Sequence, residues 1–203
     1  MSSEFLIVVV ILGMATLAVL VALGIYNRLV RSQERTREAW SGIDVQLRRR
    51  ASLVPNLVET VKGYASHERG VFEGVTRARG ALQDAKGVAE SAKANQALTG
   101  ALGRLFAVVE NYPELRASSN FQDLQDELSD IEEKIAYARQ FYNRNTAEFN
   151  ARIRSVPDIA VASIMKLERF EFFEAEEEMR EDVSVSFTPP GEIPPAEESS
   201  TQE

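Results

Sequence analysis

The chain has 203 residues, no cysteine and a formal net charge of −8. The absence of cysteine excludes disulfides, a thiolate catalyst, a Cys-ligated zinc site and lipids attached to cysteine. The negative charge belongs to the C-terminal end: residues 171–203 hold eleven acidic residues and one basic residue, whereas residues 1–170 hold 20 acidic and 22 basic residues. Neither part has the strongly basic face of a nucleic-acid-binding protein, so we expect no nucleic-acid partner.

Residues 5–26 form an uncharged apolar segment, which predicts a transmembrane helix. A helix of this length spans about 33 Å, which matches a hydrocarbon core about 30 Å thick. A removable signal peptide is the alternative. It is disfavoured because the apolar run is too long, residues 1–4 carry no Lys or Arg, and no A-x-A-like cleavage site follows. We therefore expect the lipid bilayer to hold the chain through residues 5–26.

The charges beside this segment predict how it crosses the membrane. Glu4 precedes it, whereas four arginines follow within residues 28–37. Because basic flanks stay in the cytoplasm, we expect residues 1–4 outside and the body of the chain in the cytoplasm. The opposite placement of the body stays open as the alternative. Ala18 and Ala22 form a small-xxx-small pair, which would let a second helix approach the span.

From Trp40 onward, apolar residues recur at steps of three and four, which predicts a long packed helix. Pro55 interrupts it, because proline offers no N–H and clashes with the carbonyl four residues back, that of Ala51. The helix either bends at Pro55 or ends near Ser52 and restarts. We favour one bent, continuous helix because the apolar positions keep their phase across the proline. The same pattern then extends as far as Leu82.

Two more helices are expected in residues 96–112 and 119–154, after a small, polar stretch in residues 83–96 that we interpret as a helix end or bend. Ser119 and Gln122 form a capping-box pattern at the start of the later helix. Its apolar positions alternate by three and four, which is typical of supercoiled packing. Asn145 occupies one of them, either as a register device or facing water. A short helix in residues 158–167 follows.

Charge supports antiparallel packing of these helices. Residues 28–80 carry a net charge of +5 and residues 119–134 a net charge of −5. Opposite faces favour one docking register, although each exposed ion pair contributes only about 0–1 kcal/mol. We expect the arginines at 48–50 to form a polar face that pairs with acids of a neighbouring helix. "VSVSF" (183–187) is short and alternating, and the Pro-, Glu- and Ser-rich residues 188–203 predict a disordered acidic tail.

Signatures of catalysis are sparse. His67 is the single histidine, no Glu-x-x-His occurs, and neither nucleotide-binding glycine motif is present. The carboxylates of "DELSDIEE" (126–133) spread around a helix instead of converging, and Tyr137, Phe141 and Tyr142 are expected in the core. We therefore expect no enzyme activity and no catalytic, cofactor-binding or metal site. A membrane hydrolase that uses His67 is retained as an alternative.

Two long stretches carry a family resemblance. "YNRLVRSQERTREAWSGIDVQLRRRASLVPNLVETVKGYASHE" (26–68) and "AVVENYPELRASSNFQDLQDELSDIEEKIAYARQFYNRNTAEFNARI" (107–153) resemble the LemA family. Including the apolar segment, the resemblance extends to about residue 187. It implies a bacterial single-span membrane protein with a cytoplasmic antiparallel bundle, a poorly defined molecular role and no catalytic residues. "SIMKLERFEFF" (163–173) departs from the family pattern.

These observations predict an all-α chain. It has a short outer N-terminus (1–4), a transmembrane helix (5–26), a LemA-like bundle of long helices (27–187) and an acidic tail (188–203). We expect it in the inner (plasma) membrane as an anchored interaction or scaffold protein that binds a protein partner or its own copies. An envelope-stress sensor or adaptor, in which the tail or the region of Gly70 and Gly74 changes order, is the alternative.

Overall fold

The computed structural model describes residues 3–173, and every regular element in that part of the chain is an α-helix. The all-α prediction is therefore confirmed. The short, alternating "VSVSF" (183–187) and the predicted acidic tail (188–203) lie outside the described residues. The helices are α1 (Ser3–Lys62), α2 (Arg69–Asp84), α3 (Gly87–Val109), α4 (Pro113–Arg116), α5 (Ser119–Arg152) and α6 (Asp158–Ile164).

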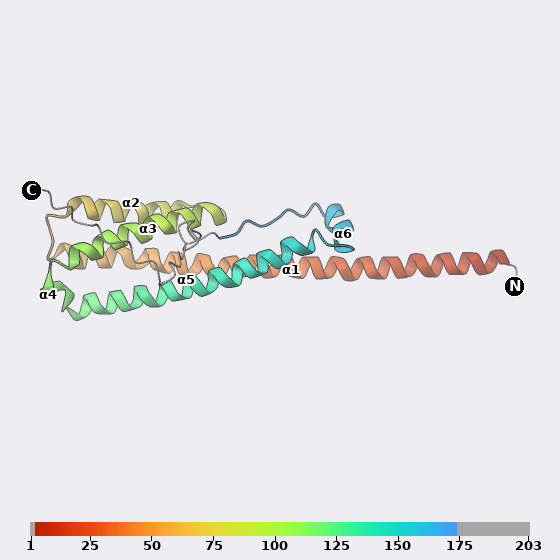
Figure 1. The fold of residues 1–203 in the computed structure, drawn as a ribbon, viewed down its shortest axis with the longest axis horizontal. Helices are drawn as coiled ribbons and strands as arrows, with labels where there is room; N and C mark the ends of the chain where they lie inside the picture. Colours follow the sequence, from red (N-terminus) through yellow and green to blue (C-terminus); the bar gives the residue numbers. More distant parts are fainter. Residues whose placement is uncertain (1–2, 174–203) are drawn as a thin grey trace, which may run out of the picture.

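The helix α1 runs the whole length of the molecule, and the other long helices pack beside its C-terminal half (Figure 1). The chain turns back at each end, so that consecutive long helices run in opposite directions, as predicted. The most extensive contact joins α1 to α5, followed by that between α2 and α3. At the other end of the bundle, α6 lies against α1, and beyond it the N-terminal part of α1 projects alone.

Two predicted boundaries were wrong. The apolar pattern from Trp40 to Leu82 is two helices, because the chain turns at residues 63–68 and the side chain in the core there is Ala65, not Tyr64. The helix end predicted in residues 83–96 is confirmed, because α2 ends at Asp84, but α3 begins at Gly87 and not near residue 96. The small side chains of this stretch let α2 and α3 approach closely, and Gly87 permits the tight turn between them with a φ of 77°.

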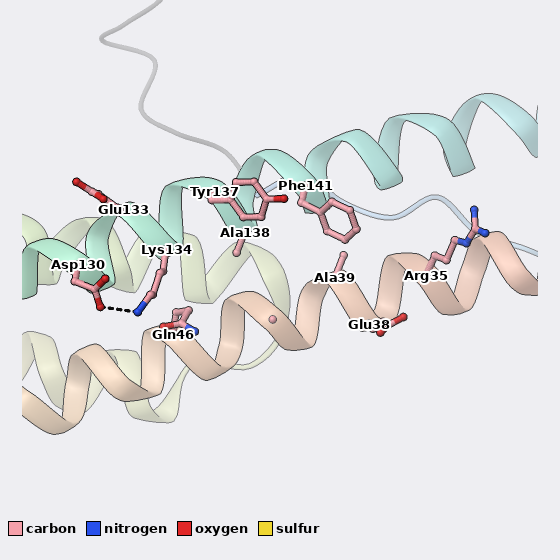
Figure 2. A pocket seen from close by; sticks show the side chains of 11 residues that line it. Arg35, Glu38, Ala39, Gln46, Asp130, Glu133, Lys134, Tyr137, Ala138 and Phe141 are labelled. Atoms are coloured by element: carbon pink, nitrogen blue, oxygen red, sulfur yellow. Dashed lines mark hydrogen bonds and ion pairs between the residues drawn. The ribbon is translucent and has the colours of Figure 1, made fainter. Parts of the chain in front are cut away.

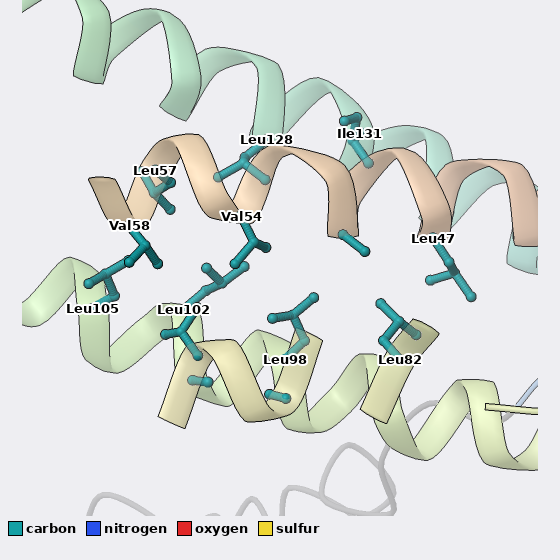
Figure 3. Close-up of a cluster of buried hydrophobic side chains, with 14 of the residues drawn as sticks. Leu47, Val54, Leu57, Val58, Leu82, Leu98, Leu102, Leu105, Leu128 and Ile131 are labelled. Atoms are coloured by element: carbon teal, nitrogen blue, oxygen red, sulfur yellow. The ribbon is translucent and has the colours of Figure 1, made fainter. Parts of the chain in front are cut away.

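The main core lies where α1, α2, α3 and α5 meet (Figure 3). Leucine is its commonest residue, and full burial of a leucine side chain stabilises the fold by about 1.5–3 kcal/mol. The core extends the predicted seams of α1 and α5 with side chains from α2 and α3. Its members include Leu47, Val54 and Leu57 of α1, Leu82 of α2, Leu98, Leu102 and Leu105 of α3, and Leu128 and Ile131 of α5.

The helix α1 continues through Pro55, so the prediction of one continuous helix is confirmed. Proline leaves the carbonyl of Ala51 without its usual donor from within the helix. A side chain from α2 replaces that donor, because Nε of Arg79 donates to the Ala51 oxygen at 2.9 Å. The neighbouring helix therefore satisfies the group that Pro55 orphans.

The three arginines after Leu47 divide their roles. Arg48 pairs with Asp44 of its own helix, and Arg49 reaches Glu127 of α5 at 2.9 Å. Arg50 is buried, with 5% of its surface exposed, and burial lowers its pKa. Its guanidinium donates to Asn95 and Thr99 of α3 at 2.6 and 3.0 Å and pairs with Glu132 of α5 at 2.9 Å. This arginine joins three helices in one register. The predicted pairing with acids of a neighbouring helix is confirmed for Arg49 and Arg50 and wrong for Arg48.

Two details of α5 differ from the predictions. The N-cap is Ser118 and not Ser119, and its hydroxyl accepts from the backbone N–H of Phe121 at 3.3 Å. Of the two alternatives for Asn145, the register device is wrong, because its side chain bonds the exposed carbonyl of Phe141 in its own helix. The buried position there is Thr146, four residues after Tyr142. The asparagines that bridge to another segment are Asn143 and Asn150.

Residues 167–173, which we call the strap, run back along α5 after α6 (Figure 1). The side-chain amide of Asn150 bonds both the N–H and the carbonyl of Phe170, each at 2.9 Å. Asn143 bonds the N–H and the carbonyl of Phe173 in the same way, at 2.9 and 3.0 Å. Seven helical residues rise about 10.5 Å and three extended residues about 10 Å, so the two spacings match.

Aromatic contacts complete the attachment of the strap. The hydroxyl of Tyr142 donates to the carbonyl of Glu171 at 2.7 Å. The ring of Trp40 lies 5.9 Å from that of Tyr142 and 6.1 Å from that of Phe173, centroid to centroid. Phe149 and Phe170 form an edge-on pair at 5.0 Å. The segment that departs from the family pattern therefore packs against α5 and α1.

We expect Arg79→Leu to lower the free energy of unfolding by about 1–3 kcal/mol, because the Ala51 carbonyl loses its donor. In a Pro55→Ala background the restored N–H replaces that donor, and the same substitution should cost less than about 1 kcal/mol. Denaturant unfolding of the full chain in detergent, followed by circular dichroism, measures this double-mutant cycle. Equal costs in the two backgrounds would refute the coupling.

Replacing Asn143 with Ala should release the end of the strap. We expect a loss of about 1–3 kcal/mol in stability, since two backbone groups lose their partners. Amide hydrogen exchange at Phe173 should accelerate, while exchange in the middle of α1 stays unchanged. Asn145→Ala serves as the control, because Asn145 bonds only its own helix. Unchanged exchange at Phe173 would show that the asparagine does not hold the strap.

Candidate functional site

An open groove runs between α1 and α5 on the side away from α2 and α3, and Figure 2 shows it from close by. It has a volume of about 830 Å³. Residues at helical spacing from both helices form its walls. They are Arg35, Glu38, Ala39, Gly42 and Gln46 of α1 and Asp130, Glu133, Lys134, Tyr137, Ala138 and Phe141 of α5.

The floor of the groove is made of small side chains. Ala39 of α1 lies beneath Phe141, and Ala138 of α5 lies across from the stretch between Ala39 and Gln46 (Figure 2). At Gly42 a Cβ atom would meet nothing within 4 Å. Two large aromatic side chains lie at its rim. Tyr137 is 73% exposed and Phe141 is 40% exposed. Contiguous exposed apolar surface of this kind is typical of sites that bind another molecule.

Charged groups of both signs border this apolar strip. Lys134 pairs with Asp130 at 2.6 Å, one turn away on the same helix (Figure 2). Arg35 and Glu38 lie at the other end of the groove. The side-chain oxygen of Gln46 is buried and accepts no hydrogen bond within residues 3–173. The arrangement suits binding of an amphipathic surface more than proton transfer, since no pair of groups converges on one point.

The structure separates the residues that the sequence offered for chemistry. His67 is exposed in the turn between α1 and α2. Glu127 and Glu132 of the acidic stretch pair with arginines of α1, whereas Asp130 and Glu133 line the groove. Within residues 3–173, no three His, Asp or Glu side chains gather closely enough to hold a metal ion. Non-enzymatic function therefore stays a prediction.

The prediction that three aromatic residues of α5 lie in the core was correct for one of them and wrong for two. Tyr142 is fully buried as predicted, but Tyr137 and Phe141 face solvent at the groove. Both fall outside the apolar seam of α5, which is the signal that a sequence reading could have used. Gly42 gives a second signal, because a glycine inside a long helix costs about 1 kcal/mol relative to alanine. The sequence analysis did not predict the groove, because an aromatic residue or a glycine in a helix is not unusual by itself.

The first part of α1 is apolar enough to cross a membrane, and none of this stretch is buried in the bundle. No other helix in residues 3–173 has this property. The apolar side chains from Phe5 to Leu23 are about half exposed or more, as lipid-facing residues would be. This exposed apolar stretch indicates that the chain is anchored in a membrane. The groove lies further along the same helix.

The family profile and the similar proteins indicate the same family. The LemA family profile matches residues 39–187. Magnetosome protein MamQ 2 of Paramagnetospirillum magneticum is 29% identical over 175 residues, covering 73% of this chain and 64% of MamQ 2. MamQ of Magnetospirillum gryphiswaldense is 29% identical over 174 residues with the same coverage. Protein LemA of Metamycoplasma hominis is 28% identical over 170 residues, 82% of this chain and 76% of that protein. This chain thus spans 64% of the length of the MamQ relatives.

We expect Gly42→Ala to raise the free energy of unfolding of the monomer by about 1 kcal/mol, because alanine favours helix and its methyl group enters open space. Denaturant unfolding in detergent at low protein concentration measures the change. Gly100→Ala on α3 is a matched control, since its Cβ would also meet nothing within 4 Å. A loss of stability at Gly42 alone would show that the groove is closed in the folded monomer.

Proposed function

Because this chain belongs to the LemA family, as the match over residues 39–187 shows, we propose that it is a membrane-tethered scaffold protein whose groove binds a second copy of itself. The groove, open along the helix that enters the membrane, is the observation that carries the proposal. The scaffold has no catalytic role of its own. It sits in the inner membrane with residues 1–4 outside and the bundle in the cytoplasm, as the arginines after the span favour.

Membrane anchoring restricts how two copies can meet. Both copies enter the same bilayer in the same direction, so their α1 helices stand parallel. A symmetric pair then has its two-fold axis along the membrane normal, and the same face of each copy meets the other. Residues at one height in the first copy therefore meet residues at the same height in the second.

The groove meets this requirement at its centre. Tyr137 and Ala138 lie across from the part of α1 between Ala39 and Gln46 (Figure 2), a part that includes Gly42. An exposed aromatic ring and an unfilled glycine thus lie at about the same height on one face. A two-fold axis along α1 brings Tyr137 of each copy to Gly42 of the other. Burial of both rings stabilises the pair through the apolar surface removed from water.

The glycines of α1 extend this face into the membrane. Gly13, Gly24 and Gly42 are 11 and 18 residues apart, which is about three and five turns at 3.6 residues per turn. They therefore share one side of the helix, and nothing lies within 4 Å of a Cβ placed at any of them. Ala18 lies about 140° around the helix from Gly13. Close approach of two spans is thus expected along the glycines and not along Ala18 and Ala22.

We expect a photo-reactive benzoylphenylalanine at Tyr137 to cross-link two copies in intact membranes. The same residue placed at the exposed Arg104 of α3, away from the groove, is the control and should give no dimer. Gly42→Phe fills the floor and should abolish the Tyr137 dimer, while circular dichroism remains that of the native chain. Denaturing gels that separate the one-copy and two-copy products measure the outcome.

Single cysteines provide a second readout, because the native chain has none. Gly24→Cys should form a disulfide dimer on mild oxidation, whereas Ala22→Cys should not. Cross-links from Tyr137 to a different protein alone, or only one-copy products at all these positions, would overturn the proposal of self-association.

A further inference from the structure

We propose that four arginines where α1 leaves the membrane form a binding site for the phosphate groups of anionic lipids. The arginines are Arg28, Arg31 and Arg35 of α1 and Arg152 at the end of α5. They line a cavity of about 130 Å³ that continues the groove toward the apolar span, with Arg35 common to both.

The acids near this cavity leave it positively charged. Asp158 pairs with Arg28 at 2.5 Å, and Glu148 pairs with Arg152 at 2.5 Å. Among the residues that the structure describes, Arg31 donates only to the carbonyl of Asn27 in its own helix, at 3.1 Å. Arg35 has no hydrogen bond or ion pair with any described residue. Within residues 3–173, Arg31 and Arg35 therefore have no acidic partner. Guanidinium groups bind phosphate oxygens through paired hydrogen bonds.

The height of the cavity matches that of lipid phosphates. The apolar run ends at Tyr26, and Arg31 is five residues further along the same helix, a rise of about 7.5 Å. A bilayer about 40–45 Å thick around a core of about 30 Å leaves about 5–7.5 Å of headgroup on each side. Arginine side chains can also reach back toward the surface. Arg31 therefore lies at headgroup level.

The element beside this cavity is fixed at the same height. Ile25 and Leu29 of α1 pack against Phe149, Ile153 and Ala162, so that α6 lies against the last turn of the span (Figure 1). We call residues 154–166 the foot. Because its buried side contacts residue 25, its exposed side lies at the bilayer surface.

The exposed side of the foot is both apolar and basic. Val156 is 87% exposed, Ile164 is 83% exposed and Ile159 is 42% exposed. Arg154 and Lys166 are exposed beside them. Apolar side chains flanked by cations are typical of surfaces that rest on anionic lipid. A lipid surface would accommodate both the foot and the arginines, whereas a free anion would leave the exposed apolar side chains of the foot in water. We therefore assign the phosphate at the arginines to a lipid.

Lipid binding to the full chain in detergent, measured by native mass spectrometry, tests the site. We expect phosphatidylglycerol to bind about tenfold or more tightly than phosphatidylcholine, since each arginine near an anionic lipid favours binding. Arg31→Gln together with Arg35→Gln should remove most of this preference. The matched control is Arg37→Gln with Arg48→Gln, which changes the charge equally but affects arginines paired with acids of their own helix.

Each other result overturns the assignment. Equal binding of the two lipids removes the site. An equal loss of preference in the control pair shows that only total charge matters. Displacement of phosphatidylglycerol by an equal concentration of inorganic phosphate shows that the arginines bind a free anion.

A spin label tests the foot independently. Val156→Cys in lipid nanodiscs should be accessible to oxygen, which concentrates in lipid, more than to a water-soluble nickel complex. Arg104→Cys on α3 should show the opposite preference. A label at position 156 that matches the one at position 104 would place the foot in water and would contradict the lipid contact.

Discussion

The continuity of α1 is the constraint on which the rest of the structure depends. One helix of 60 residues is both the candidate membrane span and the central rod of the bundle. Because a helix advances 100° and 1.5 Å per residue, the face and height of each group on the bundle are fixed relative to the span. The groove, the arginine cavity and the foot therefore have defined positions relative to the bilayer, and no flexible linker separates them from it.

Polar contacts select this arrangement among the many that apolar seams would allow. Arg50 bonds α3 and α5 at once, and a buried charge without these partners would be costly. Arg79 satisfies the carbonyl that Pro55 leaves open, which joins α2 to α1 at one height. Asn143 and Asn150 hold the strap along α5. Apolar burial provides most of the stability, and these contacts determine which faces meet.

The sequence predicted what local periodicity determines. The apolar span, the continuous helix across Pro55 and most of the seam of α5 follow from spacing alone. The end of α1 at Lys62 was not predicted, because the three-and-four spacing of apolar residues continues in the sequence through the turn. Asn145 was chosen over Thr146 because both fit a step of three or four from Tyr142. The strap and the groove depend on contacts between residues distant in the sequence, which no local pattern contains. Gly42 and Tyr137, which lie outside the apolar seams, are the only local signals of the groove that we identify.

The most direct test of the account measures α1 across the point where it leaves the membrane. Leu17→Cys and Ser41→Cys place two spin labels 24 residues apart on exposed positions, in a chain without other cysteines. Pulsed dipolar spectroscopy in lipid nanodiscs, with excess unlabelled chain to dilute contacts between copies, gives their separation. A continuous helix predicts one narrow distribution near about 36 Å. A broad distribution, or a centre well below that value, would show that the helix breaks at the membrane surface and would contradict the account.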